Sequence, residues 1–312
     1  MKKYCYGVDV GGTTVKIGLL KAEGDLLDKW EIPTNTDQGG EMILSDIATS
    51  IRENAKQRNI DFSEVLGVGI GVPGAVLLGG TVNRCVNLGW GVKAVGKELS
   101  DLLSLPVRVG NDANVAALGE MWQGGGKGHK DVLMVTLGTG VGGGLIVNGR
   151  IIVGAHGAGA EIGHIPVNRE ETESCGCGNK GCLEQYASAT GIVRMTKKLL
   201  EKDSRSSSLR EGELTAKAIF DAAKEGDALA KQAAADYYET LGFGLAAACN
   251  MADPEIVVIG GGVSKAGQIL LEGVRASYRK YAFHAQKDME FALATLGNDA
   301  GMYGSAKLLL EE

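Results

Sequence analysis

Three of the six cysteines of the chain, Cys175, Cys177 and Cys182, lie within eight residues, and His164 precedes the first of them by eleven positions. Three thiolates and one imidazole suit tetrahedral Zn²⁺, and the glycines between the cysteines let the backbone curl so that the sulfurs converge. A disulfide would leave one cysteine over and would be strained between Cys175 and Cys177. A redox pair more often has the spacing C-x-x-C. The spacing therefore predicts a zinc site formed by His164, Cys175, Cys177 and Cys182.

Four protein ligands leave zinc no open coordination position, so we expect a structural metal. It would orient His164, which could give one ring nitrogen to zinc and the other to a bound hydroxyl group. Glu161 and Glu184 lie close by along the chain, and their carboxylates could also bind the hydroxyls of a sugar. Each residue has a simpler interpretation as well: Glu184 as a carboxylate in the first turn of a helix, Glu161 as an exposed group and His164 as a metal ligand only.

Glycine-rich turns follow three apolar runs, and two of these turns join pairs of expected strands, in YGVDVGGTTVKIGLL and in VLMVTLGTGVGGGLIV. Glycine lets the backbone approach phosphate oxygens, and successive N–H groups form an anion-binding concavity. With VIGGGVS as a third loop, the hairpins predict a nucleoside triphosphate site, although each alone could be only a tight turn. The candidate binding residues are Gly11, Gly12, Thr13, Thr14, Lys16, Gly138, Thr139, Gly140, Gly261 and Gly262.

The segment GTGVGG, residues 138–143, also matches the G-x-G-x-x-G pattern of dinucleotide-binding proteins. That pattern must open a helix whose N-terminus holds the pyrophosphate. Here the chain continues as a strand, and Asn148-Gly149 provides a hairpin turn. The context therefore argues against a nicotinamide oxidoreductase, and the chain has no Walker A motif either.

Two further acidic residues stand where a strand is expected to end. In LPVRVGNDANVAALGE a strand ends, Gly110-Asn111-Asp112 turns and a helix begins. Either Asn111 or Asp112 could cap that helix, but a strand end at an interdomain crevice is also where α/β folds place chemistry. Phosphoryl transfer needs a group that takes the hydroxyl proton, and an aspartate on a rigid turn suits this task. Asp9, beside the first glycine turn, could organise Mg²⁺ through water or simply accept N–H bonds of the turn.

The periodicity of apolar residues predicts an α/β protein with a weak internal duplication, in which each half opens with a strand–glycine-turn–strand hairpin. We place the boundary near Asn111 and Asp112. The expected strands are 4–10, 14–21, 26–32, 65–72, 107–109 and 255–261, together with a second strand–glycine-turn–strand hairpin within residues 132–152. The expected helices are 40–58, 93–103, 113–121, 183–201, 216–225, 228–251, one from about 265, and 302–310.

Composition indicates an ordinary globular enzyme. The chain has 312 residues, 44% of them hydrophobic and 22% charged, with a net charge of −6. Lysine and arginine are scattered, so we expect no nucleic-acid partner. No stretch approaches the ~20 apolar residues that span a bilayer, the start does not resemble a secretory signal, and the cysteines do not form an extracellular disulfide framework. We therefore expect a cytoplasmic protein.

Six segments occur together and in order: DVGGTTVKIGLL, GNDANVAALGE, TLGTGVGGGLIVNGRI, GAGAEIGHIPV, CGCGNKGCLEQYASATGI and VIGGGVS. Together they resemble the ROK family of bacterial sugar kinases, and its glucokinases in particular. The resemblance covers nearly the whole chain. It implies a duplicated actin/hexokinase-like (ribonuclease H-like) fold with two domains around a central cleft. We expect a small domain at 1–112, completed by a C-terminal helix at about 301–312, and a large domain at 113–300 that carries the zinc loop.

The resemblance also implies roles for individual residues. Asp112 would be the catalytic base, Asn111, Glu161, His164 and Glu184 would bind the sugar, and the same four zinc ligands recur. The implied reaction is ATP-dependent, with Mg²⁺, and phosphorylates a hexose, most simply glucose at its 6-hydroxyl. Homo-oligomers are common in the family, so we expect a dimer.

Several alternatives remain open at this point. The acceptor could be N-acetylglucosamine, N-acetylmannosamine, fructose or allose, because specificity can depend on a few contacts. Polyphosphate is a poorer donor candidate, since no basic run would line an anionic groove. A sugar-responsive repressor shares the family's fold, but its N-terminal helix-turn-helix domain would need tens of residues before the hairpin that begins by Asp9.

Overall fold

The computed structural model describes residues 2–77 and 79–310, and these form two compact units. The first unit is built from residues up to Gly128, from Arg150–Gly159 and from Leu296 onward; the second comprises His129–Gly149 and Ala160–Thr295. These units differ from the expected ranges 1–112 and 113–300. The reason is helix α4 (Asp112–Gln123), which packs against the C-terminal helix α10 (Ala300–Leu308) and so belongs to the first unit.

The first unit contains a five-stranded sheet in the order β3-β2-β1-β4-β7. The antiparallel hairpin at its start carries the first glycine turn, and β4 and β7 add parallel to β1. The strands are β1 (Tyr4–Val10), β2 (Thr14–Lys21), β3 (Leu26–Pro33), β4 (Val65–Val72) and β7 (Val107–Asn111). The other elements are α1 (Asp37–Gly40), α2 (Ile43–Gln57), α3 (Val95–Leu103) and the short strands β5 (Val76–Leu77), β6 (Thr81–Val82) and β10 (Arg150–Ile151).

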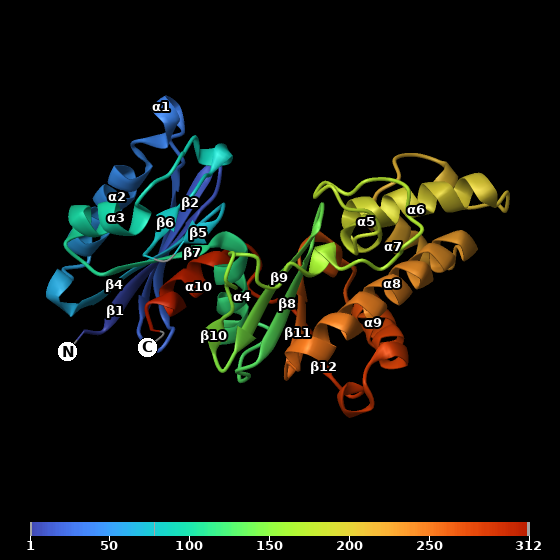
Figure 1. Ribbon diagram of the computed structural model, residues 1–312. Coiled ribbons are helices and arrows are strands. Elements are labelled where there is room, and N and C mark those ends of the chain that lie inside the picture. Colours follow the sequence, from blue (N-terminus) through green and yellow to red (C-terminus); the bar gives the residue numbers. More distant parts are fainter. Residues whose placement is uncertain (1, 78, 311–312) are drawn as a thin grey trace. The chain divides into compact units, whose positions relative to one another are not determined.

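Strand alternation separates the two faces of this sheet. Tyr6, Val8 and Val10 point into the core that α2 and α3 cover. Intervening residues face α10 on the opposite side, where a Cβ at Gly7 would lie 2.1 Å from the carbonyl oxygen of Met302. Figure 1 shows α2 and α3 on one face and α10 on the other. The period of two therefore also turns Asp9 toward α10.

The segment GVGIGV of β4 follows the same rule. Val68 and Ile70 are fully buried on the α2 and α3 side, whereas Gly69 lies under α10, where a Cβ would stand 1.6 Å from the carbonyl oxygen of Ser305. Helices α4 and α10 approach equally closely, since a Cβ at Gly304 would lie 1.6 Å from the carbonyl oxygen of Val115. Only glycine permits such contacts between backbones, so these glycines set the depth at which α10 docks.

A buried carboxylate connects the end of the first segment of this unit with the start of its last segment. Glu120, on α4, is 1% exposed. One of its oxygens accepts a hydrogen bond from the N–H of Gly125 at 2.8 Å, and the other accepts one from the N–H of Leu296 at 2.8 Å. Segments 171 residues apart are thereby held at one side chain.

The second unit contains β8 (Val132–Leu137), β9 (Val141–Val147), β11 (Ile256–Gly260) and β12 (Glu290–Leu293). Strand β9 runs antiparallel to β8, while β11 and β12 are parallel additions, which repeats the hairpin-first pattern of the first unit. Leu133, Val135, Val257 and Ile259 pack into one core with the surrounding helices. These helices are α5 (Glu184–Ala187), α6 (Ala189–Lys202), α7 (Ala216–Glu225), α8 (Ala228–Ala252) and α9 (Gln268–Tyr281).

In the second unit, the structure departs most from the sequence expectations at three places. The helix expected at 183–201 is two helices, because Ser188 has extended backbone (φ −91°, ψ 173°) and its side chain caps α6. The helix expected from about residue 265 begins at Gln268, after a 3₁₀ turn at Gly262–Ala266. Strand β12 was not expected at all. In the first unit, the short elements α1, β5, β6 and β10 were also not expected. Among the described residues, no helix is long and apolar enough to cross a bilayer.

Candidate functional site

The four residues proposed as zinc ligands converge in the second unit. One donor atom from each of His164, Cys175, Cys177 and Cys182 lies within 4.8 Å of the others. The Sγ atoms of Cys177 and Cys182 are 3.7 Å apart, and the Sγ of Cys175 is 3.9 Å from Nδ1 of His164. With zinc–sulfur bonds of about 2.3 Å, the edge of a tetrahedral site is about 3.8 Å. Both the donor set and its spacing therefore fit a structural Zn²⁺.

Backbone turns bring these ligands together in a loop with little regular structure. The N–H of Cys175 donates to the carbonyl of Asn179 at 2.7 Å, and the N–H of Gly178 donates to the carbonyl of Cys175 at 2.9 Å. Gly181 has φ +73°, and a Cβ there would lie 1.7 Å from the carbonyl oxygen of Asn168. The loop therefore needs glycine at 181 to close beside Cys182.

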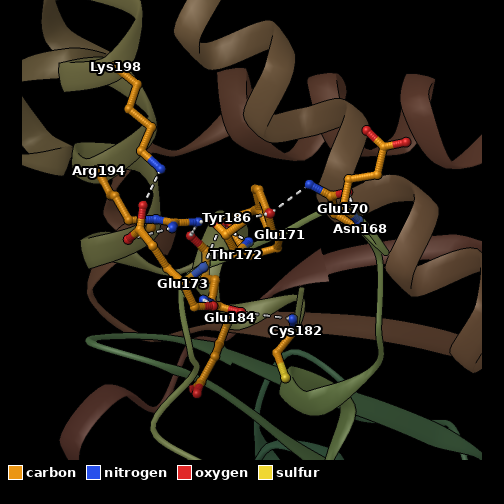
Figure 2. Close-up of polar contacts among 12 residues, drawn as sticks. Asn168, Glu170, Glu171, Thr172, Glu173, Cys182, Glu184, Tyr186, Arg194 and Lys198 are labelled. Atoms are coloured by element: carbon orange, nitrogen blue, oxygen red, sulfur yellow. Dashed lines mark hydrogen bonds and ion pairs between the residues drawn. The ribbon is translucent and has the colours of Figure 1, made fainter. Parts of the chain in front are cut away.

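A network of polar side chains braces the same loop against α6 (Figure 2). Glu171, whose side chain is 7% exposed, accepts a hydrogen bond from Tyr186 at 2.6 Å and forms an ion pair with Arg194 at 2.8 Å. The guanidinium of Arg194 also lies 5.2 Å from the centroid of the Tyr186 ring. The hydrogen bond from Tyr186, with the Arg194 ion pair, lowers the pKa of Glu171 to about 2, so this carboxylate is ionised at neutral pH.

The expected sugar-binding side chains line one hollow beside the cluster. The hollow has a volume of about 360 Å³ and is lined by Thr136, Gly138, Gly140, Val141, Gly142, Glu161, His164, Glu184 and Gly261. Nδ1 of His164 faces the cysteines, while its Nε2 lies 3.9 Å from a carboxylate oxygen of Glu161. Glu184 connects to the cluster, since the thiol of Cys175 donates to its Oε1 at 2.9 Å. The hollow thus gathers one imidazole and two carboxylates, which can exchange hydrogen bonds with hydroxyl groups.

The second glycine turn borders the same hollow. Gly138 and Gly140 line it, and the N–H of Gly138 donates to the carbonyl of Gly140 at 3.0 Å. Gly261 also lines the hollow and has φ +83°, with a Cβ there only 2.6 Å from the backbone of Leu137. Thr139 is in the turn and Gly262 follows Gly261, but neither lines the hollow. Of the eight residues of the second unit that were expected to bind phosphate or sugar, six therefore line this hollow.

Asn111 and Asp112 lie at the junction of β7 and α4 in the first unit. Asn111 is the helix cap: its Oδ1 accepts the N–H groups of Ala113 and Asn114 at 3.0 and 3.3 Å, and its Nδ2 donates to the carbonyl of Gly74. Asp112 is exposed at the first turn of α4, and its Oδ1 also accepts the N–H of Ala113, at 2.8 Å. Desolvation by the surrounding chain raises the pKa of the Asp112 carboxyl, although hydrogen bonds from Ala113 and Asn111 oppose the shift.

Asp9 lies at the end of β1, on the α10 face of the first sheet. Its carboxylate occupies the space beside Gly301, where a Cβ would stand 2.6 Å from Cγ of Asp9. Burial raises the pKa of Asp9 to about 6; Lys16 lowers it and the charge of Asp112 raises it. Gly301 was not expected from sequence as part of this site, because a helix 292 residues away supplies it.

The first glycine turn is compact and partly occupied by its own chain. The N–H of Gly11 donates to the carbonyl of Thr14 at 3.0 Å, and the hydroxyl of Thr34 donates to the carbonyl of Gly11 at 2.7 Å. A Cβ at Gly12 would meet no atom within 4 Å, and Gly12 and Thr13 are exposed. Lys16, expected to add positive charge, donates to the backbone carbonyl of Asn298 at 2.9 Å.

Sequence reasoning missed three residues of the hollow, Thr136, Val141 and Gly142. The signal was present, because Thr136 is the one polar residue in the apolar strand β8 and lies opposite Gly142 in the hairpin. A Cβ at Gly142 would lie 2.5 Å from the hydroxyl oxygen of Thr136. The hydroxyl of Thr136 therefore lines the hollow, and the missing side chain of Gly142 leaves room for it.

Comparison with known proteins agrees with this site. The sequence model described as "ROK family" matches residues 5–312. The chain belongs to the ROK family. A curated relative, the glucokinase of Halalkalibacterium halodurans, is 44% identical over 99% of this chain and 96% of its own length. The fold of this chain has two α/β units that each open with an antiparallel hairpin. It is the fold class expected from the sequence.

Two other relatives show the range of activities in the family. A solved ROK glucokinase from Streptomyces griseus, in complex with glucose and AMPPNP, has a TM-score of 0.71 and 34% identity, covering 98% of each chain. A xylose repressor of Caldicellulosiruptor bescii is 30% identical over 98% of this chain and 78% of its own length. Membership of the family therefore fixes the fold, and the choice between kinase and regulator rests on further argument.

Replacing Cys177 by serine tests the zinc site. Wild-type protein purified from zinc-replete medium should hold about one zinc per chain, and Cys177→Ser should lose most of it, because three ligands remain. Elemental analysis of the purified proteins measures this. Cys85→Ala, a buried cysteine outside the cluster, should keep the metal. Equal zinc in Cys177→Ser and wild type would rule out this ligand set.

Replacing Asp9 by asparagine tests the energetic cost of its burial. The pKa of Asp9 is about 6 in the folded protein, above its ordinary value of 3.8. Proton binding to Asp9 therefore stabilises the folded state fully below pH 3.8, and this stabilisation is lost as the pH rises through 6. At pH 7, Asp9→Asn should therefore raise the free energy of unfolding by about 1–2 kcal/mol, discounted for solvent access. Near pH 4 the difference should shrink.

Urea unfolding at both pH values measures the Asp9→Asn effect, and Asp25→Asn is the matched control. Asp25 is exposed and pairs only with Lys21, so its replacement should change stability by less than about 1 kcal/mol at either pH. A variant Asp9→Asn that is less stable than wild type at pH 7 would contradict the prediction.

Proposed function

We propose that this chain transfers the γ-phosphoryl group of ATP to the 6-hydroxyl of glucose. One observation carries the proposal: a single hollow in the second unit holds Glu161, His164 and Glu184 beside the glycine turn Gly138–Gly140. Hydroxyl-binding groups thus border a loop whose geometry suits phosphate. The 44% identical relative is a glucokinase, and the Streptomyces griseus neighbour binds glucose and AMPPNP.

Sugar recognition falls to the three side chains of the hollow. Nε2 of His164 is available to the hollow because its Nδ1 faces the cysteine cluster. The carboxylates of Glu161 and Glu184 accept hydrogen bonds from sugar hydroxyls, and Asn111 in the first unit is a further proposed contact. Charged acceptors make hydrogen bonds about twice as strong as neutral ones, which favours a polyhydroxylated ligand over an apolar one.

Asp112 is the proposed base. As the 6-hydroxyl oxygen forms its bond to the γ-phosphorus, the proton passes to the Asp112 carboxylate, the bond from phosphorus to the β–γ bridging oxygen breaks, and ADP leaves. The raised pKa of Asp112 brings its basicity closer to that needed at neutral pH. Asn111 takes the N–H of Asn114 and shares that of Ala113, which also donates to Oδ1 of Asp112 at 2.8 Å, so the second carboxylate oxygen of Asp112 is the one proposed to take the proton.

Metal ions take two separate roles in the proposal. Mg²⁺ bound with ATP would offset charge on the phosphates, and Asp9 is the residue proposed to organise it through water. The phosphates would also contact the glycine turns of Gly11, Gly12, Thr13, Thr14, Lys16, Gly138, Thr139, Gly140, Gly261 and Gly262. Zn²⁺ on His164 and the three cysteines would be structural and would orient His164.

The surroundings of the protein are part of the proposal. A cytoplasmic location would supply ATP and keep the free cysteines reduced. A net charge of −6 without a basic cluster argues against nucleic acid as a partner. We propose a homodimer in solution, on the basis of the family resemblance.

A sugar-responsive regulator is the second candidate, because a xylose repressor is 30% identical to this chain. Such a protein would bind a sugar in the same hollow without transferring phosphate. A kinase for another hexose or an N-acetylhexosamine would keep the chemistry and change the acceptor. Turnover separates the first alternative from the proposal, and acceptor preference separates the second.

An ADP-release assay across a sugar panel tests the proposal. Glucose should support turnover at a kcat/KM at least tenfold above fructose, allose, xylose, N-acetylglucosamine and N-acetylmannosamine, because a pocket can discriminate by about 10–200-fold per altered group. Reactions without sugar or without ATP are the controls. Equal turnover of N-acetyl sugars would exclude the glucose assignment. Sugar binding without ADP release from any member of the panel would favour the regulator.

Replacing Asp112 by asparagine tests the base. Asp112→Asn should lower kcat by ~10²–10⁴-fold with glucose binding retained, because only proton acceptance is lost. Wild-type kcat/KM should fall as pH is lowered through the raised pKa of Asp112, since the protonated acid cannot act as a base. Steady-state kinetics across pH measure both effects. Asp101→Asn, on an exposed residue paired with Lys97, is the matched control, and near-normal turnover by Asp112→Asn would remove the role.

A further inference from the structure

The junction between α5 and α6 connects the residues assigned to sugar with the turn assigned to phosphate. Ser188 is fully buried there and has extended backbone between the two helices. Its hydroxyl donates to the carbonyl of Glu184 at 2.6 Å and accepts the N–H of Gly191 at 2.9 Å. One side chain thus holds the last turn of α5 to the first turn of α6.

The first residues of α6 then bond to the glycine turn. The N–H of Ala189 donates to the carbonyl of Gly138 at 2.8 Å, and the hydroxyl of Thr190 donates to the carbonyl of Thr139 at 2.7 Å. These carbonyls belong to consecutive residues of the turn that borders the hollow. Helix α6 therefore fixes the orientation of two peptide groups of the glycine turn.

The turn is also in direct contact with Glu184. A Cβ at Gly140 would lie 2.6 Å from Oε2 of Glu184, so any residue other than glycine would displace one of the two. The second oxygen of the same carboxylate, Oε1, faces Cys175. A shift of the turn and a shift of Glu184 are therefore linked through both a steric contact and the hydrogen bonds of the junction.

We propose that Thr190 is a positioning residue that couples the binding of sugar and nucleotide, by holding the Gly138–Gly140 turn in the geometry that also fits Glu184. The inference rests on the proposed function, because it needs both ligands to bind at this hollow. Nucleotide that fixes the turn also fixes Glu184 through the junction, and sugar that fixes Glu184 also fixes the turn. Linkage makes the effect reciprocal, so each ligand tightens the binding of the other by the same factor.

Titration calorimetry of glucose, with and without saturating AMPPNP, measures the coupling factor. Wild-type protein should bind glucose at least about fivefold more tightly with AMPPNP present, the lower end of typical coupling. Thr190→Val keeps the shape of the side chain but removes the hydroxyl donor, and should bring this factor close to one. Thr190→Ser retains the hydroxyl and should restore most of the coupling.

Two controls separate positioning from general damage. Thr240→Val removes an exposed hydroxyl that bonds only to its own helix, at the carbonyl of Asp236, and should leave the coupling factor unchanged. Zinc content and melting temperature should be nearly the same in Thr190→Val as in wild type, because Thr190 is exposed and is not one of the four proposed zinc ligands.

Each outcome of this experiment decides something. Loss of coupling in Thr190→Val with rescue by Thr190→Ser supports the inference. Unchanged coupling in Thr190→Val, equal loss in Thr190→Ser, or no coupling in wild type that still phosphorylates glucose would overturn it. Failure of the proposed function looks different, since wild-type protein would then release no ADP with glucose.

Discussion

The arrangement of the site in the second unit depends on the convergence of the His164 imidazole and the thiols of Cys175, Cys177 and Cys182. The loop that carries them has few regular backbone hydrogen bonds, yet it must hold His164 and Glu184 at the hollow. A metal can supply that order directly, because its bonds fix both the positions of the ligands and the tautomer of the histidine. The ionised Glu171 and Arg194 pair braces the loop from its other side. The proposed sugar-binding residues thus adjoin a loop that both the four-ligand cluster and this ion pair hold.

Close approach of backbones is the second constraint, and it requires glycine at several of the 48 glycine positions. In the first unit Gly69 and Gly304 let α10 sit directly on the sheet and on α4. In the second unit Gly140 leaves room for the Glu184 carboxylate, and Gly181 lets the cysteine loop close. The same chemical property, the missing Cβ, therefore serves both the packing of the core and the shape of the site.

Local patterns predicted much of this structure. Cys175, Cys177 and Cys182 lie in one short stretch, so their spacing alone indicated a shared metal, and the glycine hairpins were visible as apolar runs that stop and restart. Features that depend on distant partners were hidden. The contact of Asp9 with Gly301, the pairing of Glu171 with Arg194 and the grouping of α4 with α10 all join residues whose separation carries no periodic signal. The break at Ser188 was missed because no proline or glycine marks it.

The packing of α10 on glycines of the first sheet affects how the chain folds during its synthesis. The strands of the first sheet lie within residues 4–111, but the helix that covers one of its faces lies at residues 300–308 and is synthesised after them and after the second unit. Residues 129–149 and 160–295 can assemble their own core before that helix is available. We expect the nascent chain to carry an uncovered sheet face until residues 300–308 have been synthesised, and that face is where chaperone binding during synthesis would be most useful.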